Sequence, residues 1–181
     1  MPEYLFGYRA RLSIVMGLLA YCCQTFAVDL PEEQIKAGYL YNFSKFTEWP
    51  STTLPSAADI QVCLLGSGLV IDAMDALDGK STGEHHLHIQ HIAREQQASN
   101  CQVLFISQSE QARFQVALQA VKNMPILTVS DIENFAEAGG AIGFLVRDSK
   151  VKFEVNLETV RNSTLHLPGQ LLNIAYHVYG E

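Results

Sequence analysis

"IQVCLLGSG", residues Ile60 to Gly68, decides the expected fold class more than any other stretch of the 181-residue chain. Its first six residues are nearly all apolar, which is typical of a strand buried on both faces of a sheet. The two glycines permit a tight turn, and residues 69–79 are expected to form a helix after it. The stretch therefore predicts a central strand that leads directly into a helix.

Further strand patterns follow along the chain, over residues 86–92, 101–107 and 125–129. Between the second and the third, Ser107 and Glu110 have the spacing of a capping box for a helix that continues through Val121. Strands that are separated by helices favour a mainly parallel sheet with right-handed crossovers.

The pattern changes after Gly140. Two strand-like runs, 141–146 and 151–157, are joined by four polar residues, 147–150, which predicts a C-terminal antiparallel hairpin. A last helix is expected over 170–180, and its inward residues are Leu171, Leu172, Ala175 and Val178. Together these elements predict an α/β fold, a three-layer sandwich.

An aromatic helix is predicted before the first strand, in "GYLYNFSKFTEWP", Gly38 to Pro50. It is expected to begin at Pro31 and to end at Pro50. At a helical step of about 100°, five apolar residues share one arc and are expected to pack in the core. They are Ile35, Tyr39, Phe43, Phe46 and Trp49.

The polar side of that helix carries Tyr41, Lys45 and Glu48. Core packing does not explain an aromatic ring on this side, whereas protein interfaces favour Tyr and Trp. We therefore expect Tyr41, Lys45, Glu48 and the corner at Trp49 to contact a second protein.

Residues 1–27 have the order of a secretory signal. Arg9 and Arg11 precede an apolar run, 12–23, and small residues flank a cleavage site after Ala27. The run is short for a membrane span, and a lipoprotein signal or an uncleaved anchor remain as alternatives. The prediction is export to the periplasm, followed by a single domain over 28–181, with no membrane span after cleavage.

The charge balance of the chain is acidic, with a net charge of −7. Cleavage would remove two arginines and one glutamate, which leaves 10 basic and 18 acidic residues and a net charge of −8. A nucleic-acid partner is not expected for such a domain.

The cysteine count also changes on cleavage, because Cys22 and Cys23 would leave with the signal. Two cysteines in an exported domain, Cys63 and Cys101, suggest one disulfide. Two separate buried thiols remain the alternative.

Motifs for chemistry are few. Gly66 and Gly68 are followed by Ile71 where a dinucleotide-binding motif has its third glycine, so no nucleotide is expected. In "EHHLHIQH" the side chains of His86 and His88 would project from one side of a strand and could share a metal. A third ligand is missing, so we predict that this weak candidate binds no metal in function.

Catalytic motifs are equally sparse. The sequence has no Gly-x-Ser-x-Gly elbow, and neither His166 nor His177 has a sequence neighbour that suggests a triad. We therefore predict no catalytic residues and no cofactor. An unrecognised hydrolase, or a small-ligand or metal-binding protein, remains the alternative.

The chain resembles the YfiR-like family of exported bacterial proteins over about residues 34–179. The segments that carry the resemblance are "YLYNFSKFTEWP", "VCLLG", "CQVLFIS", "ILTVSD", "GGAIGFLV", "VKFEVNL" and "LLNIA". The resemblance implies a periplasmic domain with a Rossmann-like, mainly parallel sheet, a disulfide between Cys63 and Cys101, and a tendency to form homodimers.

The resemblance also implies a function. A YfiR-like protein represses an inner-membrane diguanylate cyclase by binding its periplasmic domain, and the repression responds to redox state. This chain lacks the second cysteine pair that the family member has near the C-terminal hairpin, as residues 144–153 show. We therefore expect a regulatory binding protein for a diguanylate cyclase or a sensor kinase, and not an enzyme.

Overall fold

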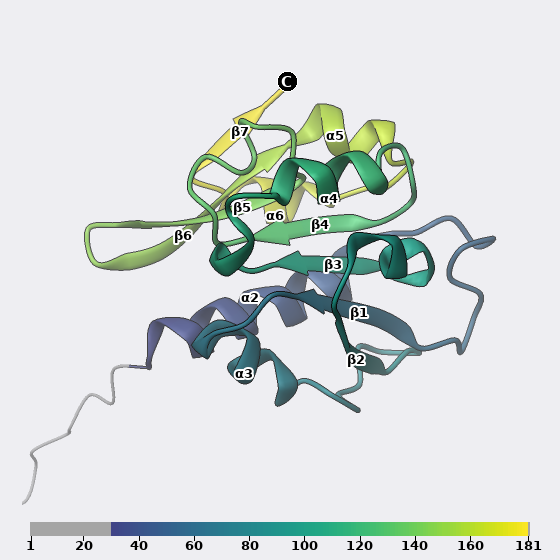
Figure 1. The fold of residues 1–181 in the computed structure, drawn as a ribbon. Helices are drawn as coiled ribbons and strands as arrows, with labels where there is room; N and C mark the ends of the chain where they lie inside the picture. The colour runs from purple at the N-terminus through teal and green to yellow at the C-terminus, as the bar shows by residue number, and fades with distance from the viewer. Residues whose placement is uncertain (1–29, 181) are drawn as a thin grey trace, which may run out of the picture. The chain divides into compact units, whose positions relative to one another are not determined.

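Seven strands form one sheet in the computed structural model, which describes residues 30–180 (Figure 1). The strands are β1 Ile60–Leu65, β2 Leu87–Ile92, β3 Val103–Ile106, β4 Leu127–Ser130, β5 Ile142–Arg147, β6 Lys150–Asn156 and β7 His177–Tyr179. The helices are α2 Glu32–Phe46, α3 Leu69–Asp75, α4 Phe114–Ala120, α5 Leu157–Asn162 and α6 Gly169–Leu172. Two short 3-10 helices are η1 Glu95–Asn100 and η2 Gln108–Glu110.

The strand order is β2-β1-β3-β4-β5-β6-β7, and all neighbours run parallel except β5 and β6. This confirms the mainly parallel α/β sheet with a C-terminal antiparallel hairpin. The hairpin turns at Asp148 and Ser149, whose φ angles are 52° and 58°. Two left-handed residues in succession match the twist of a two-residue hairpin, so Arg147 pairs directly with Lys150.

The sheet separates two cores, because successive side chains of a strand point to opposite faces. In β1, Val62 and Leu64 belong to the core shared with α2 and α3. The next residues, Cys63 and Leu65, belong to the core shared with α4. The three-layer sandwich is therefore confirmed.

Helix α2 begins as predicted, but its buried side differs from the predicted arc. The buried residues are Lys36, Ala37, Leu40, Phe43 and Ser44. Phe43 is in the core as expected, whereas Phe46 is 44% exposed. The prediction for Phe46 was wrong because burial follows residues 36, 40 and 43, a stripe displaced from the aromatic one.

A buried ion pair explains why a lysine lies on the inner side of α2. The ammonium of Lys36 is 2.6 Å from a carboxylate oxygen of Glu32 and 3.6 Å from one of Asp131. The side chains of Lys36 and Asp131 are 9% and 8% exposed, and the same Asp131 accepts a hydrogen bond from the Gln108 N–H at 2.7 Å. These contacts tie the start of α2 to the carboxyl end of β4.

Trp49 lies beyond the helix, since α2 ends at Phe46 and Thr47 is already extended. The helical step of about 100° that was used to predict the position of the Trp49 ring therefore does not apply to this residue. Glu48 instead forms a bridge with His166, through N–H to O distances of 3.0 and 3.2 Å. The chain thus leaves α2 as an extended segment beside residues 165–167.

The last predicted helix was wrong beyond its first turn. Helix α6 ends at Leu172, and β7 then extends the sheet parallel to β6. The Tyr176 N–H donates to the Phe153 carbonyl at 2.7 Å, and Val178 pairs with Val155. Available hydrogen bonds at the free edge of β6, with β-prone residues at 178 and 179, outweigh the helical spacing of the leucines.

The predicted capping box is present only in part. Ser107 accepts a hydrogen bond from the Ser109 N–H at 3.2 Å, but it caps the 3-10 helix η2. Glu110 pairs with Arg113, and α4 begins only at Phe114.

No helix within residues 30–180 combines the length and the apolar character needed to cross a bilayer. The predicted signal sequence and its cleavage site lie outside the residues that the structure describes.

Candidate interaction surface

The predicted disulfide is formed. Cys63 lies in β1 and Cys101 lies between η1 and β3, two residues before that strand, and β1 and β3 are neighbours in the sheet. The two Cα atoms are 6.0 Å apart, within the usual range for a disulfide. Both cysteines are buried in the core that β1 and β3 share with η1 and α4, so reductants reach the bond only after local opening.

Two of the predicted contact residues use their polar atoms within the chain. The Tyr41 hydroxyl donates to the Ser81 carbonyl at 2.7 Å, and the half-buried ring packs against the core. The Trp49 indole N–H donates to the Gln102 carbonyl at 3.3 Å. Both rings are therefore anchored, and only part of each reaches solvent.

The other two predicted contact residues, Lys45 and Glu48, are exposed. The Lys45 ammonium lies 5.4 Å from the centroid of the exposed Phe46 ring, within the range of a cation–π contact. Phe46 therefore presents an exposed apolar ring beside a cation at the end of α2.

An apolar cleft continues from Phe46 toward α6, with a volume of about 200 Å³. Its lining residues are Tyr39, Asn42, Phe43, Phe46, Pro168, Gln170, Leu171 and Ile174. Ile174 is 64% exposed, and Tyr176 beyond it is also exposed. We call Lys45, Phe46, Glu48 and Ile174 the Phe46 patch.

The sequence did not identify Ile174 as a surface residue of interest. It was expected within the predicted helix over 170–180, and other residues defined the inward side of that helix. A single turn at α6 followed by β7 leaves this side chain on the surface. Its large apolar character was the only signal in the sequence, and isolated exposed apolar residues are common.

The crevice where doubly wound sheets usually bind ligands lies at the carboxyl ends of β1 and β3, and here it is closed. The Ser107 hydroxyl donates to the Ser67 carbonyl at 2.7 Å, and the Ser67 N–H donates to Ser109 at 3.0 Å. A Cβ atom on Gly66 would lie 2.5 Å from the Ser109 hydroxyl oxygen. Gly66 therefore allows the loop after β1 and the loop after β3 to approach each other closely.

The histidine cluster lies on and beside β2, which is an edge strand of the sheet. His86 is exposed and forms a bridge with Ser81, ahead of the strand. His88 lies 3.5 Å from an Asp78 carboxylate oxygen, and the His91 Nε2 lies 2.6 Å from one of Asp75. Residues 30–180 contain no group of three or more His, Cys, Asp or Glu positioned to hold a metal.

Within residues 30–180, three ionisable groups have clearly shifted pKa values. Burial, with the nearby carboxylate of Glu154, raises the pKa of Tyr179. The hydrogen bond from Arg113 to Glu110 raises the pKa of that guanidinium, and a backbone hydrogen bond lowers the pKa of Glu95.

His166 and His177 are both exposed, and His177 stacks edge-on against Tyr179 at 4.3 Å.

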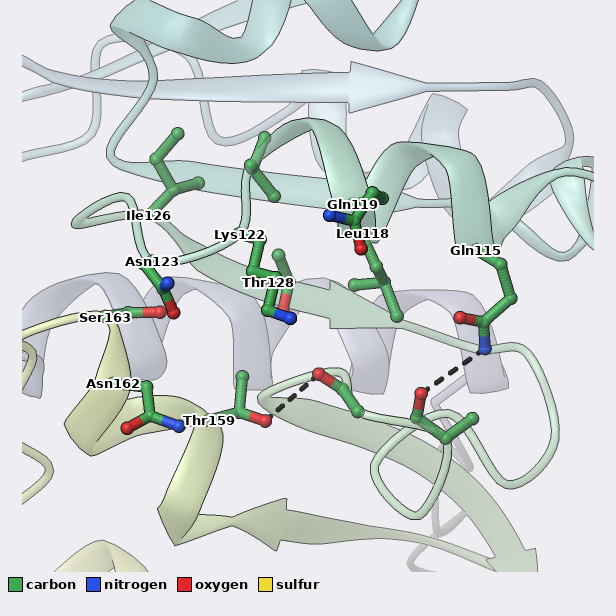
Figure 2. A pocket seen from close by; sticks show the side chains of 13 residues that line it. Gln115, Leu118, Gln119, Lys122, Asn123, Ile126, Thr128, Thr159, Asn162 and Ser163 are labelled. Atoms are coloured by element: carbon green, nitrogen blue, oxygen red, sulfur yellow. Dashed lines mark hydrogen bonds between the residues drawn. The ribbon is translucent and has the colours of Figure 1, made fainter.

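A second concave region lies between α4 and α5, on the sheet face opposite α2 (Figure 2). Its volume is about 250 Å³. The lining residues are Gln115, Leu118, Gln119, Val121, Lys122, Asn123, Ile126, Thr128, Ala138, Gly139, Thr159, Asn162 and Ser163. Because four of them are side-chain amides, we call this region the amide groove.

Comparison with known proteins gives a family. The model of the YfiR/HmsC-like family matches residues 33–176 of this chain. No curated protein matches the sequence.

Comparison with solved structures supports the fold alone. One similar structure is described as the ABC domain in complex with L-Trp from Streptococcus pneumonia, with a TM-score of 0.57 and 9% identity. The similarity covers 78% of this chain and 60% of that one, so this chain spans less than two thirds of the other protein.

Proposed function

This chain belongs to the YfiR/HmsC-like family, and from that premise we propose that it is a periplasmic regulatory protein that binds the periplasmic domain of an inner-membrane signalling enzyme. Membership supports a regulator of cyclic di-GMP signalling at the family level rather than a catalyst. The signalling enzyme is proposed to be a diguanylate cyclase or a sensor kinase. The match over residues 33–176 is the observation that carries this proposal.

The Phe46 patch is the proposed contact surface. An exposed phenylalanine and an exposed isoleucine border one apolar cleft, and the exposed residues Lys45 and Glu48, of opposite charge, lie within two positions of Phe46 in the chain. Apolar centres with polar rims are the usual anatomy of protein interfaces. Tyr41 and Trp49 stay in the proposed surface through the parts of their rings that solvent reaches.

Any redox response is proposed to act through the Cys63–Cys101 pair. These are the only cysteines of the predicted mature chain, and their bond joins neighbouring strands under α4. Reduction would loosen that side of the sheet and so act on the Phe46 patch indirectly.

The test is capture of a membrane signalling protein by the mature chain, residues 28–181, with Phe46→Ser and Ile174→Ser as variants. Both side chains are exposed, so we expect each variant to keep its melting temperature and to lose at least tenfold in partner affinity. Val116→Ser is the matched control, because Val116 is 56% exposed on α4, on the opposite face.

Equal capture by wild type and both patch variants would remove this surface from the proposal. The mass of the protein in solution separates the two kinds of partner. If Phe46→Ser converts a homodimer to a monomer and leaves membrane capture unchanged, the patch serves a second copy of the chain instead.

A further inference from the structure

The amide groove is a polar cleft whose lining is almost free of charge. Its hydrogen-bonding side chains are four amides, three hydroxyls and a single lysine, and no carboxylate lines it. Figure 2 shows Gln119, Lys122 and Asn123 on one side facing Thr159, Asn162 and Ser163 on the other. The groove therefore lacks the acidic character of the chain as a whole, whose net charge is −7.

Two of the lining side chains hold the shape of the groove. The Thr159 hydroxyl donates to the Gly139 carbonyl at 3.0 Å, and the Gln115 amide donates to the Ala138 carbonyl at 3.3 Å (Figure 2). Both bonds fix the same loop, at residues 138–139, between α4 and α5. The wall of the groove is therefore formed before any ligand arrives.

Three other amides remain available. The side chains of Gln119, Asn123 and Asn162 form no hydrogen bond with any other part of residues 30–180, and all three residues are exposed. A primary amide offers two N–H donors and one carbonyl acceptor. Each of these side chains can therefore bind two neighbouring groups that both donate and accept.

The inner part of the groove is apolar. Val121 and Ile126 are buried there, and Leu118 is half-buried beside them. A ligand that fits must therefore combine an apolar surface with hydrogen-bonding groups at its edge.

We propose that the amide groove binds a neutral sugar residue. A sugar ring has an apolar C–H face and adjacent hydroxyls, each of which is a donor and an acceptor. The volume of about 250 Å³ lies just below the range of drug-sized pockets and suits one ring. This inference does not rest on the proposed partner, because the groove and the Phe46 patch lie on opposite faces of the sheet.

The experiment is NMR titration of the ¹⁵N-labelled mature chain with glucose, mannose, galactose and N-acetylglucosamine, each used alone. We expect at least one sugar to shift the side-chain amides of Gln119, Asn123 and Asn162. Asn162→Ala, and Asn123→Gly, which suits the positive φ of 59° at that position, should each weaken that binding about tenfold. Asn173→Ala, an exposed asparagine next to α6, is the matched control and should change nothing.

Two results would overturn the inference. They are the absence of shifts with all four sugars, and shifts that both groove variants retain while folded.

Discussion

The two faces of the sheet are held to their helices in different ways. On the α2 face, Tyr39, Phe43, Phe144 and Phe153 form one aromatic cluster with ring centroids 5.0 to 6.1 Å apart. The α4 face has about half as many buried apolar residues, and it contains the Cys63–Cys101 bond.

The difference follows from the helices that each face receives. Helix α2 has 15 residues, whereas α4 has 7, so α4 can bury far less apolar surface. Two inner residues of β4 on that side, Thr128 and Ser130, are also polar and use their hydroxyls in hydrogen bonds. The Cys63–Cys101 disulfide therefore lies on the face of the sheet that buries fewer apolar residues.

The strongest test of this comparison is Phe43→Ala. The ring is fully buried and contacts three other aromatic rings, so its removal should lower the free energy of unfolding by about 4 to 5 kcal/mol. Urea unfolding measures the change. Phe46→Ala, three residues along the same helix, should cost less than about 1 kcal/mol because that ring is exposed. Equal losses in the two variants would contradict the assignment of the buried side of α2.

Removal of the disulfide tests the other face. The bond closes a loop with a sequence separation of 38, and Cys63→Ser with Cys101→Ser should lower the free energy of unfolding by about 4 kcal/mol. Chemical reduction of the wild type should give a similar loss. Thiol counting on the denatured, unreduced mature chain should find no free thiol, and a count of two per chain would show that the bond is absent.

Gly140→Ala tests the packing of the α4 face next to the hairpin. A Cβ atom at this position would overlap the buried ring of Phe135, which packs against Phe114 at 5.9 Å. We expect a loss of about 2 kcal/mol in unfolding free energy. In the double variant, Gly140→Ala with Phe135→Leu, the overlap is smaller. Part of the lost unfolding free energy should therefore be recovered. No recovery would mean that the ring is not the cause.

The smallest expected effect concerns pH at the edge strand β7. The pKa of Tyr179 is raised, so the folded chain keeps its phenol proton at a pH where the unfolded chain has lost it. Stability should therefore be full below about pH 10, the ordinary value, and should fall as pH rises through the raised pKa. Phenolate absorbance measures the titration, and Tyr179→Phe should reduce the alkaline loss of stability. An identical pH profile in the variant would contradict this.

The sequence predicted the parallel strands β1 to β4 because β1 and β3 are short apolar runs, β2 alternates apolar and polar residues, and β4 is a short β-prone segment. Similar local signals predicted the hairpin at residues 147–150, and these signals depend only on residues near each other in the chain. The disulfide was instead suggested by the count of two cysteines in the predicted exported domain and by the family resemblance. The family resemblance added the implied function, which composition and spacing did not provide.

The candidate surface was predicted less well. The helix that contains Tyr41 and Lys45 was expected, but the exposure of Phe46 and the anchoring of Tyr41 were not. Periodicity gives the angle between two side chains around a helix axis. It does not say which side of the helix packs against the sheet. Lys36 shows the difficulty, because its burial depends on Asp131 in a distant part of the chain.

The sequence by itself determined the mainly parallel sheet and the C-terminal hairpin, since local propensity suffices for these features. Only the tertiary structure decided that residues 177–179 form a strand, that Phe46 and Ile174 border one apolar cleft, and that the amides of α4 and α5 share one groove. Each of these outcomes depends on contacts between segments that are distant in the chain. Hydrogen bonds and burial gained through such contacts outweigh the local preferences that a sequence pattern reports.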